Sequence, residues 1–133
     1  MRKLAACVSL LLIAFSLGTA HLADPFEGTK WNVVVTPDPS APGSEKEFKD
    51  VLIFKGGMFR ATECEKHGFK PVQYDENTTR MGPATFTAEP TSAKEGKAKW
   101  TGTVTANMMT GDMVWTKKDG TEIHYTFKGE RQG

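Results

Sequence analysis

The densest group of reactive side chains in the sequence is the segment Glu63-Cys64-Glu65-Lys66-His67. Cys64 and His67 stand three positions apart, so a thiolate and an imidazole could share a metal ion, with a neighbouring glutamate adding an oxygen. A nucleophilic thiol activated by His67 is a second interpretation. The ordinary alternative is a polar turn that closes a preceding strand. We keep Cys64 and His67 as candidate ligands of a copper or zinc ion.

Five aromatic side chains form the second candidate site. They are expected to face a common interior, where they either line a pocket for a small apolar or planar ligand or fill the interior completely. These residues are Trp31, Trp100, Trp115, Tyr125 and Phe127. Met109 and Met113 could bind Cu(I) through their thioethers, but both also suit the filling of gaps in a core.

No other pattern in the sequence indicates chemistry. We find no Ser-His-Asp set, paired carboxylates or phosphate-binding loop, so we expect neither an enzyme nor a bound cofactor. The chain carries a formal net charge of +1, with both signs interspersed. Nucleic-acid binding requires a basic stripe, and we therefore do not expect a nucleic-acid partner.

The first 20 residues have the pattern of a signal peptide. Arg2 and Lys3 precede an uncharged apolar run over Leu4 to Leu17, and Gly18-Thr19-Ala20 supplies the small residues of a cleavage site. The run is shorter than the roughly 20 residues that a membrane span needs. We therefore expect residues 21–133 to form a single domain in the periplasm or outside the cell, with no membrane span after cleavage.

Cleavage after Ala20 would remove Cys7 and leave Cys64 as the lone thiol. An internal disulfide is then impossible, and the domain must be stabilised by burial of apolar side chains. Free cysteines are commonly buried, which is what we expect for Cys64.

Period-two alternation of apolar and polar residues predicts most of the domain to be strand. The clearest strands are Lys97 to Thr105, Thr110 to Thr116 and Glu122 to Lys128, and further strands are predicted over Thr29 to Thr36, Lys49 to Lys55, Met58 to Glu63, Phe69 to Tyr74 and Thr85 to Ala88. Hairpin turns are expected at Gly56-Gly57 and Asp119-Gly120. Ser44 to Asp50 is predicted to make one helical turn.

The pattern predicts an all-β fold, namely a small antiparallel up-and-down β-barrel of about eight strands. A β-sandwich is the alternative.

Two further features resemble the calycin group of lipocalin-like and avidin-like barrels. Gly28-Thr29-Lys30-Trp31 opens the first predicted strand, and Arg131 follows the last. In that group an early tryptophan packs across the barrel floor beneath a basic side chain from the end of the chain. The resemblance assigns these roles to Trp31 and Arg131 and implies the architecture of residues 28–131.

The sequence thus favours an exported, non-enzymatic protein that binds a small apolar or aromatic ligand. A metal-handling protein that uses Cys64 and His67 is one alternative, and an envelope protein with a structural or interaction role is another. The sequence determines neither the ligand nor the oligomeric state.

Overall fold

The computed structural model describes residues 24–79 and 82–133, so the predicted signal peptide lies outside the described residues. The described chain forms ten strands and one short helix, α1 (Thr62–Glu65). The strands are β1 (Lys30–Pro37), β2 (Phe48–Lys55), β3 (Met58–Ala61), β4 (Val72–Gln73), β5 (Asp75–Asn77), β6 (Ala84–Ala88), β7 (Thr91–Ser92), β8 (Gly96–Thr105), β9 (Met108–Thr116) and β10 (Glu122–Arg131).

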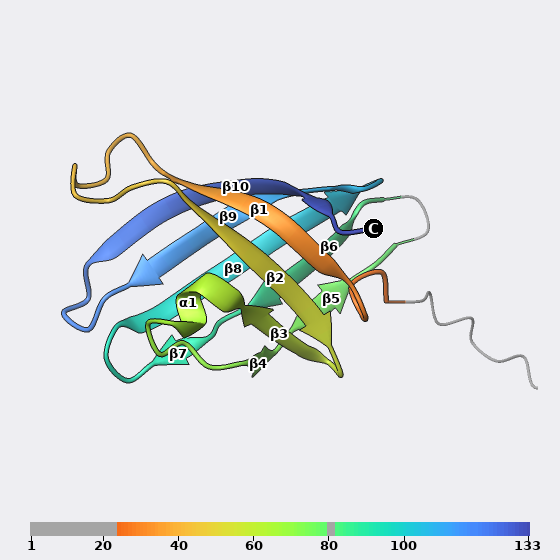
Figure 1. The fold of residues 1–133 in the computed structure, drawn as a ribbon, viewed down its shortest axis with the longest axis horizontal. Helices are drawn as coiled ribbons and strands as arrows, with labels where there is room; N and C mark the ends of the chain where they lie inside the picture. The colour runs from red at the N-terminus through yellow and green to blue at the C-terminus, as the bar shows by residue number, and fades with distance from the viewer. Residues whose placement is uncertain (1–23, 80–81) are drawn as a thin grey trace, which may run out of the picture.

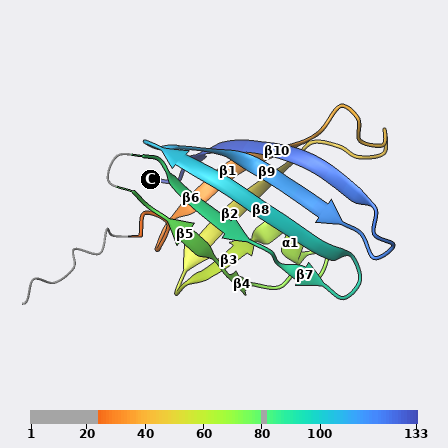
Figure 2. The same ribbon diagram turned by 180° about the vertical axis from the view of Figure 1, so that it is seen from behind.

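All ten strands belong to one antiparallel sheet that curves into a nearly closed barrel (Figures 1 and 2). The order is β4-β3-β2-β1-β10-β9-β8-β6-β5, with β7 paired to β8 beside β6. Most neighbours are consecutive in the chain, and the first and last strands pair with each other. The gap between β4 and β5 is bridged by a single residue, Tyr74. The predicted up-and-down barrel is therefore confirmed, and the sandwich alternative does not apply.

The alternation that predicted the strands determines which side chains enter the barrel. On β10, Ile123, Tyr125 and Phe127 are buried, whereas His124 and Thr126 between them are exposed. The neighbouring strand β9, which pairs with β10, buries Met109 and Met113 in the same way. Because successive strand residues point to opposite faces, these strands deliver aromatic and thioether groups to one interior.

One end and the middle of the barrel are filled by aromatic rings. Phe26, just before β1, is fully buried and contacts Phe54 and Phe86, with ring centroids 5.2 and 5.3 Å away. Farther in, Trp100 packs against Phe59 and Phe127 at 5.7 and 5.2 Å. These rings fill one end and the middle of the interior, so a ligand cannot occupy that part of the barrel.

Two facing glycines make this packing possible. Gly102 on β8 pairs directly with Gly111 on β9. A Cβ atom on Gly111 would lie 2.1 Å from the carbonyl oxygen of Thr101 and 2.6 Å from the Phe127 ring. The Phe127 ring therefore occupies space that any side chain on Gly111 would need.

Some local predictions were wrong. Ser44 to Asp50 forms no helical turn: residues 45–47 are irregular, and β2 begins at Phe48. The strand from Met58 ends at Ala61, and the chain then turns into α1. At Asp119-Gly120 only the glycine has positive φ, so the hairpin is present but its turn is not type I′. At Gly56-Gly57 both φ angles are positive, 62° and 75°, as a type I′ turn requires.

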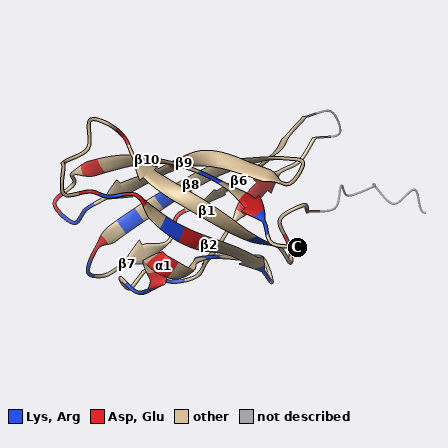
Figure 3. Ribbon diagram, turned by 45° about the horizontal axis from the view of Figure 1, so that its top comes forward, with Lys and Arg blue, Asp and Glu red and all other residues tan. Residues whose placement is uncertain are grey.

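Lys and Arg on the one hand and Asp and Glu on the other are both scattered over the strands and loops (Figure 3). In the part of the chain that the structure describes, no helix has the length and apolar character needed to span a membrane.

Candidate functional site

The end of the barrel opposite Phe26 contains a cavity of about 470 Å³. It lies where the β1–β2 loop, α1 and the β7–β8 loop meet, at the left of Figure 1. Its walls combine apolar side chains with charged side chains at the rim. The lining residues are Glu45, Lys46, Phe48, Glu63, Cys64, His67, Phe69, Glu95, Ala98, Met113, Trp115 and Tyr125. This end of the barrel is the candidate site.

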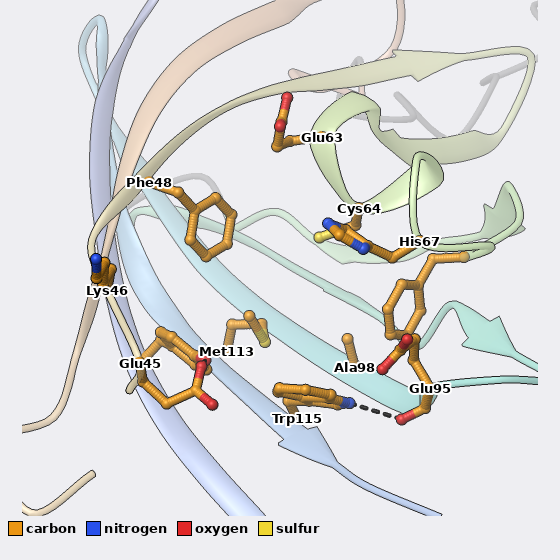
Figure 4. Close-up of a pocket in the computed structure, with 12 residues that line it drawn as sticks. Glu45, Lys46, Phe48, Glu63, Cys64, His67, Glu95, Ala98, Met113 and Trp115 are labelled. Atoms are coloured by element: carbon orange, nitrogen blue, oxygen red, sulfur yellow. Dashed lines mark hydrogen bonds between the residues drawn. The ribbon is translucent and has the colours of Figure 1, made fainter. Parts of the chain in front are cut away.

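Strands β8 and β9 supply one wall of the cavity. Ala98 and Trp115 are directly paired across the two strands, and Met113 lies two positions before Trp115 on the same face. The Trp115 indole Nε1–H donates to the carbonyl oxygen of Glu95 at 2.7 Å, as Figure 4 shows. This bond fixes the indole and ties it to the β7–β8 loop. Ala98 and Trp115 both line the cavity, and the small Ala98 side chain takes up little of its volume.

Phe48 and Tyr125 form a second part of the wall. Their rings meet edge to face, with centroids 6.1 Å apart. The Tyr125 hydroxyl donates to Glu45 Oε2 at 2.6 Å. Burial, and then the Glu45 carboxylate, raise the pKa of Tyr125 above its usual range, so the phenol stays protonated and keeps donating to Glu45.

A buried aspartate holds α1 against the barrel. Asp50 lies on β2 at an inward-facing position and is only 3% exposed. Its Oδ1 accepts the backbone N–H of Glu63 at 2.9 Å, near the start of α1, and that of Val51 at 2.7 Å. Burial raises the pKa of Asp50, and these hydrogen bonds oppose the rise.

Cys64 and His67, the candidate metal ligands, both line the cavity. Cys64 is buried, and its thiol lies 3.5 Å from Asp50 Oδ2. Burial and the negative charge of Asp50 raise the pKa of Cys64 well above its ordinary value, which disfavours the thiolate that a metal or a nucleophilic reaction would need. His67 is exposed. Among residues 24–79 and 82–133, no three His, Cys, Asp or Glu side chains are arranged to hold a metal ion.

The five aromatic candidates separate into two groups. Trp115 and Tyr125 line the cavity. Trp31, Trp100 and Phe127 are 1%, 0% and 3% exposed and belong to the filled core instead. The Trp31 indole donates to Thr29 Oγ1 at 2.8 Å, whereas the Trp100 indole N–H has no hydrogen-bond partner among the described residues.

Sequence reasoning missed several cavity residues. Phe48 lies on the inward face of β2, one position before the predicted strand Lys49 to Lys55, so extending that alternation by one residue could have indicated it. Phe69 opens the predicted strand Phe69 to Tyr74, but only Val72–Gln73 of that segment forms a strand, and Glu45 lies in the predicted helical turn that does not form. No family model, curated protein or solved structure matches this chain.

Proposed function

We propose that this protein binds a small apolar or aromatic ligand in the cavity at the open end of its barrel, and that it does so without catalysing a reaction. One observation carries the proposal: the barrel interior is filled by rings at one end and in the middle, but leaves about 470 Å³ free at the other end. Pockets that hold small organic molecules have volumes of about 300–1,000 Å³.

The composition of the cavity wall supports this proposal. Phe48, Met113 and Trp115 offer apolar surface to a ligand, while the Tyr125 hydroxyl and the charged rim offer polar groups that could orient it. Binding sites for small molecules commonly combine a mainly apolar wall with a few fixed polar groups. The hydrogen bonds of Trp115 and Tyr125 hold both rings in place before a ligand arrives, which reduces the entropy lost on binding.

We further propose that the protein is exported and that its barrel is of the calycin type. The nearly closed antiparallel barrel is compatible with a calycin-like fold, and Trp31 on β1 stands opposite Arg131 on β10 in the strand register. Cleavage near residue 20 would leave the complete barrel, which begins shortly after Asp24.

Calorimetric titration with the neutral aromatic naphthylmethanol tests the binding site. The indole N–H resonance of Trp115 in proton–nitrogen correlation spectra serves as the local reporter, because the other two indoles lie in the filled core. We expect saturable binding and a shift of the Trp115 resonance.

Matched variants locate that binding. Phe48 and Val104 are both partly buried apolar residues packed against the core, but only Phe48 lines the cavity. Phe48→Ala should weaken binding about tenfold or more, from the lost apolar contact, and Val104→Ala should leave it unchanged. If no member of a panel of aromatic compounds, neutral or charged, binds or moves the Trp115 resonance, the proposed function is wrong.

A further inference from the structure

The charges around the cavity are unbalanced. Three of its lining residues, Glu45, Glu63 and Glu95, carry carboxylates, whereas Lys46 is the one lysine among them. The cavity therefore has an excess of negative charge, in a chain whose total charge is close to zero. Walls of low polarity strengthen such a field, because less water screens it.

The three carboxylates are neutralised to different degrees. Glu63 pairs with Lys66 at 2.9 Å. Glu95 lies 4.0 Å from the ammonium of Lys94, a side chain that is 81% exposed. Glu45 takes part in no ion pair among the described residues, and its hydrogen bond comes from the neutral hydroxyl of Tyr125. The half-buried Glu45 therefore places an uncompensated negative charge beside apolar walls.

The aromatic side chains of the cavity wall also favour a positively charged ligand. The face of an indole ring attracts a cation through its quadrupole, as the ammonium of Lys117, 4.9 Å from the Trp115 ring centre, illustrates; Lys117 itself does not line the cavity. In the view of Figure 4, Glu45 and Glu95 lie on opposite sides of the Trp115 indole. Tyr125 donates to the Glu45 carboxylate and Trp115 donates to the Glu95 backbone, so an ammonium group near either glutamate would also be close to an aromatic ring.

We infer that the ligand of this cavity is an organic cation, namely an aromatic or amphiphilic amine. Its apolar body lies against Phe48, Met113 and Trp115, and its ammonium group pairs with Glu45 or Glu95. Lys46 is exposed at the rim, where its ammonium stays in water, and it therefore does not offset the half-buried Glu45. This inference rests on the proposed function, since it assigns a charge to the ligand of the same site.

Three ligands of one ring system and different charge test the inference. They are naphthylmethylamine, naphthylmethanol and naphthylacetate, each titrated calorimetrically into protein purified after expression of the full chain. The amine should bind about tenfold more tightly than the alcohol, because it forms a charge-assisted contact, and the carboxylate should bind most weakly. High salt should weaken binding of the amine and leave that of the alcohol unchanged.

Two cavity variants, Glu45→Gln and Glu95→Gln, identify the carboxylate involved, and a third variant outside the cavity is their control. Glu45→Gln retains an oxygen that can accept from Tyr125 but removes the charge, and Glu76→Gln removes the same charge from exposed β5, outside the cavity. We expect Glu45→Gln to reduce the preference for the amine over the alcohol several-fold, and Glu76→Gln to leave it unchanged.

The outcomes separate this inference from the proposed function. Equal affinity for naphthylmethylamine and naphthylmethanol overturns the charge assignment but leaves the binding function in place. Tighter binding of naphthylacetate than of naphthylmethanol, measured in competition, has the same meaning. A preference for the amine that persists in both Glu45→Gln and Glu95→Gln also overturns it. Failure of all three ligands to bind contradicts both proposals.

Discussion

Replacing Asp50 by alanine tests how α1 is held against the barrel. The carboxylate of Asp50 accepts two short backbone hydrogen bonds, from Val51 at 2.7 Å and Glu63 at 2.9 Å. A longer contact from the Thr62 hydroxyl, at 3.4 Å, adds to them. Alanine leaves these partly buried donors without an acceptor and opens space beneath α1.

The loss of stability in Asp50→Ala follows from the number of hydrogen-bond donors left unpaired. Each buried donor without a partner costs about 1–3 kcal/mol, and the weaker contacts add little, so Asp50→Ala should lower the free energy of unfolding by about 2–4 kcal/mol. For a domain of this size, that corresponds to a fall in melting temperature of about 8–16 °C.

Asp50→Asn separates the acceptor from the charge. It keeps one oxygen for the two N–H groups but removes the buried carboxylate. Because burial raises the pKa of Asp50 in the folded state, the folded protein holds that proton more tightly than the unfolded chain does. Ionised Asp50 is therefore destabilising at neutral pH, and this contribution disappears as the pH falls below the ordinary value for aspartate. Asp50→Asn should be at least as stable as the natural protein at pH ~7.

Urea unfolding followed by tryptophan fluorescence, at neutral and mildly acidic pH, measures these differences. The advantage of Asp50→Asn over the natural protein should shrink on acidification. If Asp50→Ala and Asp50→Asn have equal stability, the acceptor role assigned to Asp50 is wrong. If the pH has no influence on the difference between Asp50→Asn and the natural protein, the assigned direction of the pKa shift is wrong.

Three further predictions concern packing and reactivity. Gly111→Ala should destabilise the protein by about 3 kcal/mol or more through overpacking, because its Cβ would meet backbone atoms and the Phe127 ring. The control Gly43→Ala, with open space around it, should be neutral in the same urea assay. Similar stabilities of the two variants would contradict the account of Gly111. Phe26→Ala should cost about 3–5 kcal/mol from lost contacts with Phe54 and Phe86, and a loss below ~1 kcal/mol would show that this end of the barrel does not need the ring. In a Cys7→Ser background, Cys64 should react with a thiol reagent at neutral pH only when urea unfolds the protein, because burial raises its pKa; rapid reaction of the folded protein would refute this.

The strands were predictable where one face is buried and the other is exposed to solvent. The alternation of β10 gives Ile123, Tyr125 and Phe127 to the interior, and the structure agrees. In contrast, β5 is exposed at all three positions and β7 has only two residues, so neither carries a period that sequence reasoning can detect. The strands that alternation could not reveal are thus the short ones near the gap in the barrel.

The candidate site was harder to predict, because alternation tells which residues point inward but not how far along the barrel they lie. Trp115 and Trp100 both face the interior, yet only Trp115 reaches the cavity. That difference depends on strand register and on Phe26, which fills the far end from outside the strands. The predicted helical turn at Ser44 failed because Glu45 instead bonds to Tyr125, 80 positions away in the chain, a contact that no local signal contains.

The pairing of β1 with β10 has a consequence for how the chain folds. The first strand formed during synthesis finds one of its two partners only when Phe127 and Arg131 have emerged from the ribosome, about a hundred residues later. Such long-range pairing gives a high contact order and slow folding. Until then β1 presents an unpaired edge, at which the incompletely folded chain can pair with another chain and aggregate.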